Sequence, residues 1–372
     1  MRATRWILCA ALLAGCGDND PAPEGAAEPP ATKAEVAQAN VDGKADWSLD
    51  PCERWGWYGD GACDWFCWDH DPDCDPSPLG PEPQGTATRF PIVLAHGFDA
   101  SPTNRWGWYG VAEALRADGH AVHVASVPPY APVATRAGYL ARAIDEALES
   151  HGADQVHMVA HSMGGLDSRY VISTLGYGDR VVTLTTISSP HRGSYVTDVA
   201  LKLTPELAEP ALNALARAWG RTYSELADDT DLRGALNDLS EAAAPAFNAA
   251  NPDDPRVKYL SWAGVSSPLG LPNPQDFVAC DGKALHGRGV QDKMDATLVP
   301  MAAFAAHGAA LAPNDGMVQV ASARWGEFQG CIPADHLDEV GQVRDDGPDP
   351  YTGFDHVRFY RNLAFDLARR EP

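Results

Sequence analysis

Short apolar runs alternate with amphipathic stretches over most of the chain after residue 89. Runs of strand length occupy residues 92–95, 121–127, 156–161, 181–187 and 257–263, with a shorter candidate at 317–320. Apolar positions at helical spacing occupy residues 110–117, 137–149, 166–172 and 354–367. Apolar strands that alternate with helices indicate a mostly parallel sheet with helices on both faces. We therefore expect an α/β fold for residues 89–372.

One long stretch breaks this alternation. Residues 199–250 are rich in Ala and Leu and have helical character throughout. We interpret them as a helical insertion that forms a lid over an apolar site. The alternative is an insertion that only packs against the domain.

The first residues have the pattern of an export signal. Arg2 and Arg5 precede an apolar run at 6–13 that is too short to span a bilayer. The run closes with the letters LAGC, ending at Cys16, which resemble the lipobox of bacterial lipoproteins. We expect residues 1–16 to be a lipoprotein-type signal peptide and Cys16 to carry lipid. The protein would then be exported, as an outer-membrane or cell-surface lipoprotein or as an extracellular protein, and the lipid anchor would be its membrane contact. An ordinary signal peptide with a chance cysteine is the alternative.

Three segments of contrasting composition separate this signal from the main domain. Residues 17–46 are rich in Ala, Pro, Glu and Asp and have almost no large apolar side chains, which predicts a disordered tether. Residues 47–75 form a small Cys-rich module, and residues 76–88 form a Pro-rich linker. Export favours two disulfides in the module, whereas the spacing of Cys63 and Cys67 leaves a zinc site as the competing interpretation. The cysteines of the module are Cys52, Cys63, Cys67 and Cys74.

The charge balance narrows the class of partner. The chain of 372 residues has 28 basic and 51 acidic residues, for a net charge of -23. A surface this acidic repels polyanions, so we expect no nucleic-acid partner. It suits uncharged or cation-bearing substrates and is in keeping with a calcium requirement.

A serine between small residues ends one of the apolar runs. The letters VHMVAHSMGG cover residues 156–165, and a helical stretch follows directly. This is the pattern of a nucleophile elbow, a tight strand-to-helix turn that lifts a serine hydroxyl above a parallel sheet. The turn requires small residues two positions before and after the serine, and Ala160 and Gly164 stand there. We therefore predict that Ser162 is a catalytic nucleophile, with a Gly-rich turn after a buried strand as the structural alternative.

A serine nucleophile needs a base to take its proton and a carboxylate to orient that base. On hydrolase folds of this kind the three follow in the order serine, acid, histidine. Asp315 lies in a turn beside a candidate strand, and His336 follows 21 residues later. His356 is the rival base, but it falls within the terminal helical stretch.

Five motifs in a fixed order make a more specific pattern. They read PIVLAHGF (91–98), AHSMGG (160–165), SPHRGS (189–194), NDG (314–316) and HLDEVGQ (336–342). Over residues 89–372 this series resembles the calcium-binding bacterial triacylglycerol lipases of the α/β-hydrolase superfamily. The resemblance implies an α/β-hydrolase fold and hydrolysis of acylglycerols as lipid or ester substrates. The family includes members that fold with a dedicated chaperone, so such a chaperone is a candidate partner, and the sequence does not decide whether this chain depends on one.

The resemblance also implies roles for particular residues. Ser162 would be the nucleophile, Asp315 the orienting acid and His336 the base. The backbone N–H groups of Phe98 and Met163 would form the oxyanion hole.

A single structural calcium ion is implied near the histidine loop. Its ligands would be Asp338, Gln342 through its side-chain oxygen, Asp346 through its carbonyl, and Asp295, with Asp292 as an alternative to Asp295. Oxygen ligands with two carboxylates suit Ca2+. The resemblance supplies no disulfide at Cys280 and Cys331, so we expect that pair only because these two cysteines remain.

Other functions share parts of this pattern. A short-chain esterase, a polyester hydrolase or an acyltransferase would use the same acyl-enzyme. A non-catalytic surface-binding lipoprotein on a hydrolase scaffold is a further alternative, because a fold does not determine a function.

Overall fold

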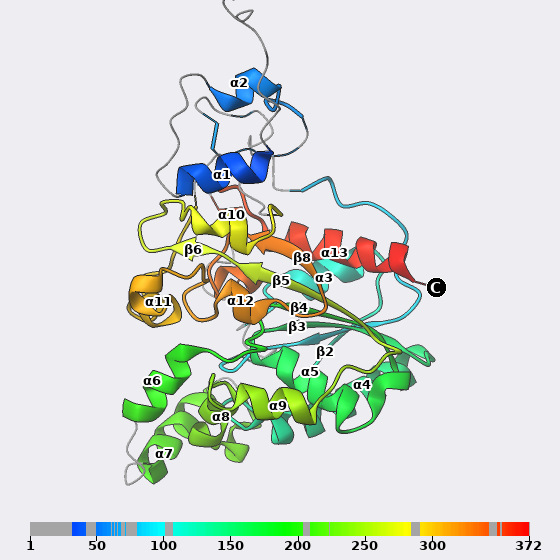
Figure 1. The fold of residues 1–372 in the computed structure, drawn as a ribbon. Coiled ribbons are helices and arrows are strands. Elements are labelled where there is room, and N and C mark those ends of the chain that lie inside the picture. Colours follow the sequence, from blue (N-terminus) through cyan, green and yellow to red (C-terminus); the bar gives the residue numbers. More distant parts are fainter. Residues whose placement is uncertain are drawn as a thin grey trace, which may run out of the picture.

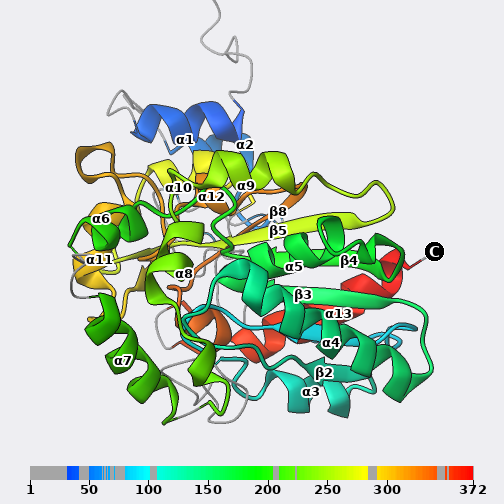
Figure 2. The same ribbon diagram turned by 90° about the horizontal axis from the view of Figure 1, so that it is seen from below.

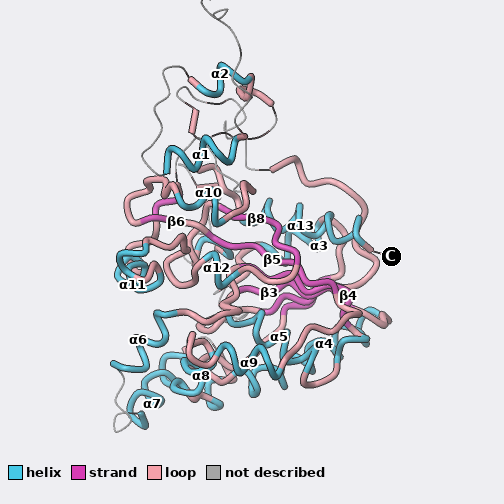
Figure 3. Tube along the Cα trace, viewed as in Figure 1, coloured by secondary structure: helices cyan, strands magenta, loops and turns pink. Residues whose placement is uncertain are grey.

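Within the described residues of the computed structural model, a six-stranded sheet runs through the centre of the molecule (Figures 1 and 3). Its order is β2-β1-β3-β4-β5-β8, and every neighbouring pair is parallel. The described residues are 32–41, 50–60, 62, 64, 66–67, 71, 80–100, 107–203, 209–222, 224–283, 291–341, 348–349 and 352–371. The strands are β1 Ile92–Ala95, β2 Val122–Val124, β3 Val156–His161, β4 Val181–Ile187, β5 Lys258–Gly264 and β8 Glu327–Ile332.

Helices cover both faces of this sheet, as the alternating pattern predicts. α3 (Val111–Ala117) and α13 (His356–Arg370) pack on one face, and α4 (Val133–His151) and α5 (Met163–Ser173) pack on the other (Figures 1 and 2). The central strands β1 and β3 are buried along their whole length, so they can be apolar at every position. The α/β prediction is confirmed.

Two details at the end of the sheet differ from the prediction. Residues 317–320 form a turn rather than a strand, because one oxygen of the Asp315 carboxylate accepts hydrogen bonds from the N–H groups of Met317 and Val318 and curls the chain. The short helix α12 (Val320–Ala323) follows. The sixth strand is instead β8, whose mixed polar and apolar residues suit an edge strand with a single neighbour.

The insertion is helical. After β4 come α6 (Tyr195–Leu203), α7 (Glu209–Gly220), the 3-10 turn η4 (Ala227–Asp229), α8 (Leu232–Asp238) and α9 (Ala244–Ala250). α8 packs through Ala235 and Leu239 against Met163 at the start of α5. α6 lies beside α11 (Val299–Ala305) on the same side of the molecule (Figure 2).

Smaller elements follow α5 and surround the end of β5. They are η2 (Tyr177–Asp179), β6 (Ser266–Ser267), α10 (Gln275–Ala279), β7 (Asp292–Lys293), η5 (Gly308–Ala310) and η6 (Asp338–Val340). β6 and β7 pair as a small parallel ladder. The Cys280–Cys331 disulfide joins the end of α10 to β8, as expected.

The N-terminal region is more structured than the sequence indicates. Residues 33–41, placed in the disordered tether, form helix α1 (Lys33–Val41), because Val36 is fully buried and Lys33 pairs with Asp60 and Asp64 of the Cys-rich module. The module contains α2 (Pro51–Trp55) and packs on α10 through an edge-to-face contact of Phe66 with Phe277. The signal peptide and Cys16 lie outside the described residues.

One pair of the module's cysteines forms a disulfide, which distinguishes between the disulfide and zinc interpretations. A Cys52–Cys67 disulfide closes the module, which removes two of the four thiols that a zinc site would need. Cys63 and Cys74 lie outside the described residues. None of the helices among the described residues is both long enough and apolar enough to cross a membrane.

His96, the residue after β1, is buried as a neutral side chain. It is 2% exposed, its Nδ1 lies 3.1 Å from the Gly97 carbonyl, and its Nε2 accepts the Val127 N–H at 3.3 Å. Burial, with the charge of Arg136 as a second cause, lowers the pKa of His96 to about 3. Protonation must therefore accompany unfolding at any pH between that value and the ordinary histidine pKa of about 6.5.

The His96→Gln variant tests how much this protonation lowers the free energy of unfolding in acid. In the wild type, His96 binds a proton when the protein unfolds, so acid favours unfolding. The glutamine of the variant binds no proton, so the variant lacks this contribution. The wild-type advantage in free energy of unfolding should shrink by about 2 kcal/mol between pH 6.5 and pH 4.5. Urea denaturation at both pH values measures it. His151→Gln, which removes an exposed histidine, is the control, and an advantage of His96 that does not change with pH would contradict the assignment.

Candidate active site

Ser162 occupies a strained turn between β3 and α5. Its backbone has φ 55° and ψ -130°, a region that costs about 1–3 kcal/mol for a residue with a side chain. The turn closes because position 164 has no side chain, since a Cβ on Gly164 would lie 2.4 Å from the Ala95 carbonyl oxygen. The local geometry is therefore that of a nucleophile elbow.

Ser162, His336 and Asp315 form one continuous hydrogen-bonded chain. The Ser162 hydroxyl lies 2.8 Å from His336 Nε2, and His336 Nδ1 lies 2.8 Å from Asp315 Oδ2. The other oxygen of Asp315 is held by the two N–H groups of the 315–318 turn. Asp315 is 1% exposed, Ser162 7% and His336 9%, so little solvent competes for these bonds. In this arrangement the hydroxyl can transfer its proton to the imidazole, and the carboxylate holds the tautomer.

The two predicted oxyanion donors flank this serine. Met163 is the first residue of α5, where an N–H has no acceptor within the helix. Phe98 follows Gly97, whose backbone is so close that an added Cβ would lie 2.8 Å from the Ser162 Cβ. Within the described part of the chain, neither N–H donates a hydrogen bond. Both remain available to a ligand.

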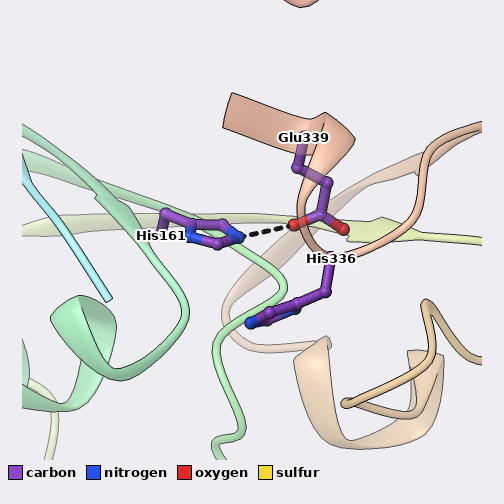
Figure 4. Close-up of side chains that lie close together, drawn as sticks. All are labelled: His161, His336 and Glu339. Atoms are coloured by element: carbon purple, nitrogen blue, oxygen red, sulfur yellow. Dashed lines mark hydrogen bonds and ion pairs between the residues drawn. The ribbon is translucent and has the colours of Figure 1, made fainter. Parts of the chain in front are cut away.

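A buried pair that the sequence analysis did not single out lies behind His336. His161 Nε2 is 2.9 Å from Glu339 Oε2, and the His161 and His336 rings are 4.6 Å apart (Figure 4). Ser188 donates to the other Glu339 oxygen at 2.5 Å. Burial and the neighbouring Asp315 hold the pKa of Glu339 well above its ordinary value, and burial with His336 nearby lowers the pKa of His161. We infer that the pair is neutral, with the carboxylic acid donating to the imidazole.

These three residues are close enough to resemble a metal site, but the chemistry excludes one. Both ring nitrogens of His336 are already engaged, by Ser162 and by Asp315. A cation there would have to displace the serine or the aspartate. A second group that is close enough to hold a metal ion comprises Asp64, Cys67 and Asp71. It lacks a thiolate ligand, because the Cys67 sulfur is bonded to Cys52 in a disulfide.

A second acidic cluster adjoins the histidine loop. Carboxylate oxygens of Asp292, Asp335 and Asp338 all lie within 4.8 Å of one another. The Asp292 Oδ2 atom is buried and has no hydrogen-bond partner. Burial and the charge of Asp335 raise the pKa of Asp292 to about 8. A buried orphan oxygen beside two further carboxylates is the donor set that Ca2+ binds.

Of the two aspartates predicted as the upstream calcium ligand, Asp292 lies in this cluster with Asp338. Asp295 does not share the cluster. Its side chain instead accepts hydrogen bonds from Thr297, and its N–H donates to Asp335 at 2.6 Å. Asp295, which we predicted ahead of Asp292, is therefore not part of the carboxylate cluster, and the choice between the two as a ligand stays a prediction. Gln342 and Asp346, the other predicted ligands, lie outside the described residues.

Asp335 was also missed by the sequence analysis. It immediately precedes His336, and one of its oxygens accepts the N–H groups of Leu337 and Asp338 at 2.9 and 3.0 Å. It thereby shapes the turn that presents His336. A carboxylate directly before the histidine was the available signal.

Known proteins resemble this chain in sequence and in fold. The family model for the alpha/beta hydrolase fold matches residues 91–253. A protein named triacylglycerol lipase 2 from Saccharomyces cerevisiae is 29% identical, covering 71% of this chain and 73% of the relative. A triacylglycerol lipase from Pseudarthrobacter phenanthrenivorans is 28% identical, covering 69% of this chain and 90% of the relative.

Among solved structures, a metagenomic carboxyl esterase superposes with a TM-score of 0.58. The sequences are 17% identical, and the match covers 92% of each chain. A likeness at this identity bears on the fold alone. Together with the strand order and the family model, it shows that the chain has the α/β-hydrolase fold.

Proposed function

We propose that this chain is a carboxylic ester hydrolase of the triacylglycerol lipase type, working by a Ser162–His336–Asp315 acyl-enzyme mechanism. The observation that carries the proposal is the unbroken hydrogen-bonded chain from Asp315 through His336 to Ser162. The names of the sequence relatives support the substrate class.

The geometry accounts for each step of ester cleavage. The Ser162 oxygen bonds to the ester carbonyl carbon while its proton passes to His336 Nε2, and the Phe98 and Met163 N–H groups bind the oxyanion. His336 then returns the proton to the leaving alcohol as the carbon–oxygen bond breaks. Water, deprotonated by the same imidazole, attacks the acyl-enzyme and releases the carboxylic acid and Ser162.

An apolar surface beside the histidine loop favours a lipid substrate. α11 buries Leu298 and Ala302 against a cluster that includes Leu337, the residue after His336. Its outer side presents exposed apolar side chains, and neighbouring segments add more. α11 itself exposes Val299, Met301 and Phe304, and α6 and η5, which contact α11, add Leu203 and the capping residue Leu311. Such a surface suits contact with an oil droplet or membrane surface better than contact with water.

We further propose that α6–α9 act as the lid. Ser162 and His336 are nearly buried, and α8 packs directly against Met163. A bulky acylglycerol therefore requires the covering helices to move.

We also propose export with a lipid anchor at Cys16, and one structural calcium ion. The two disulfides support an oxidising compartment. Asp292 and Asp338 would hold the ion by carboxylate oxygens, and it would neutralise charge and brace the loop that carries His336.

The serine assignment predicts complete loss of turnover in Ser162→Ala. Removing the nucleophile leaves only binding and the oxyanion donors, so hydrolysis of p-nitrophenyl butyrate should fall by at least about 10⁴-fold. Ser189→Ala removes another buried serine hydroxyl that has no partner in the described structure, and should retain activity. Initial rates measure the activity of both variants, and circular dichroism checks that both are folded. Activity that survives in a folded Ser162→Ala protein would overturn the mechanism.

The lipid assignment predicts a separation between substrates. The double variant Met301→Ser with Phe304→Ser makes the α11 surface polar, so hydrolysis of emulsified triolein should fall at least about fivefold while hydrolysis of soluble p-nitrophenyl butyrate stays within about twofold. Leu175→Ser is a matched control, because Leu175 and Phe304 are each 40% exposed. Equal losses on both substrates would argue against a role in lipid contact.

The calcium proposal predicts a metal-dependent melting temperature. Calcium at 100 times its dissociation constant would add about 2.7 kcal/mol, so chelation with EDTA should lower Tm by about 5 °C or more. Asp292→Asn should abolish this calcium-dependent increment, and Asp295→Asn should keep it. Thermal melts with calcium and with EDTA measure both. An increment that survives in Asp292→Asn and disappears in Asp295→Asn would reverse the assignment.

A further inference from the structure

Arg136 is an arginine with no contact to water. It lies in the first turn of α4, is 0% exposed, and is among the largest fully buried side chains of the described structure. A buried guanidinium is costly unless its charge and its N–H groups are all matched. Its partners therefore show what the side chain holds in place.

Those partners lie on three segments, which are α5, the loop after β1 and the loop after β2. Arg136 Nε donates to Asp167 Oδ2 at 2.8 Å, and Asp167 lies on α5, five residues after Ser162. A terminal nitrogen of Arg136 donates to the His96 carbonyl at 2.8 Å and the Gly97 carbonyl at 3.0 Å. The remaining terminal nitrogen donates to the Pro128 carbonyl at 3.0 Å.

The hydrogen bond from Arg136 to the Gly97 carbonyl, which His96 Nδ1 also approaches to 3.1 Å, constrains the direction of the next N–H group. In a planar trans peptide the C=O of one residue and the N–H of the next are antiparallel. With the Gly97 oxygen held toward Arg136, the Phe98 N–H must point away from the guanidinium. The Gly97 backbone itself lies against the Ser162 side chain. Rotation of this peptide would withdraw the donor from the serine.

We propose that Arg136, paired with Asp167, is a positioning residue that holds the Gly97–Phe98 peptide in the orientation needed for the oxyanion hole. The pair links the loop that carries one donor to the helix that carries the other, so both donors keep a fixed relation to Ser162. This inference rests on the proposed function, because it concerns the same reaction.

The residue type matters as well as the charge. Arginine presents its N–H donors in a rigid planar fork, whereas lysine offers a compact ammonium. Arg136→Lys keeps the positive charge but cannot bond Asp167 and both loop carbonyls in this geometry. The loss should therefore appear in the chemical step, because the oxyanion exists only there.

The test compares Arg136→Lys with Arg169→Lys. Arg169 is also a buried arginine, 2% exposed, but it holds Asn248 and Asn251 of the α9 region and stacks on Trp325. Burial raises the pKa of Asp167 to about 7, so assays at pH 8 keep its carboxylate charged. In Arg136→Lys, kcat for p-nitrophenyl butyrate should fall at least tenfold, with KM within about twofold. The inhibition constant of a phenylboronic acid, which mimics the tetrahedral intermediate, should rise in parallel. In Arg169→Lys only the melting temperature should fall.

A double variant separates positioning from stability. Arg136→Met with Asp167→Leu removes both charges together, so the fold should regain much of the stability that Arg136→Met alone loses. The low kcat should persist, because the guanidinium no longer holds the His96 and Gly97 carbonyls and only His96 Nδ1, at 3.1 Å, stays beside the Gly97 oxygen. Recovery of kcat with stability, or equal kcat losses in Arg136→Lys and Arg169→Lys, would overturn the positioning role. Absence of wild-type ester hydrolysis would instead overturn the proposed function.

Discussion

The close approach of three backbone segments around Ser162 is the constraint on which the site depends. The loop after β1, the turn after β3 and the loop after β8 must meet within hydrogen-bonding distance of one hydroxyl. Parallel strands make this meeting feasible, because their carboxyl ends share one edge of the sheet. Gly97 and Gly164 permit it, because a side chain at either position would collide with the neighbouring segment.

Buried polar groups then give each segment its orientation. Arg136 and Asp167 hold the loop after β1. The hydrogen-bonded pair of His161 and Glu339 packs behind His336. Asp335 shapes the turn that carries His336. Each group would be costly alone and is tolerated because it is paired. The acidic cluster at Asp292 is the exception, since one of its buried oxygens has no hydrogen-bond partner, and this unpaired oxygen supports the proposal of a calcium ion there.

The sequence predicted the parts of this architecture that depend on local pattern. The apolar runs of β1, β3 and β4 and the elbow at Ser162 were readable because burial on both faces leaves little ambiguity. The edge strand β8 was missed because its polar residues weaken the pattern. The prediction of a strand at 317–320 was wrong because the Asp315 side chain, and not the apolar content, determines the backbone conformation there. The choice between Asp292 and Asp295, and the role of Arg136, depend on contacts between distant segments, and no spacing along the chain encodes those.

The carboxylate of Glu371 has a mechanical consequence. It accepts hydrogen bonds from the N–H groups of Arg89 and Phe90 and lies 2.8 Å from His157 Nε2, so it ties the start of the domain to its last residues. Residues 80–82 are also fastened to α13 by Arg358 and Asn362. A force that pulls residues 80–90 away from α13 would therefore have to break these hydrogen bonds before it reached β1.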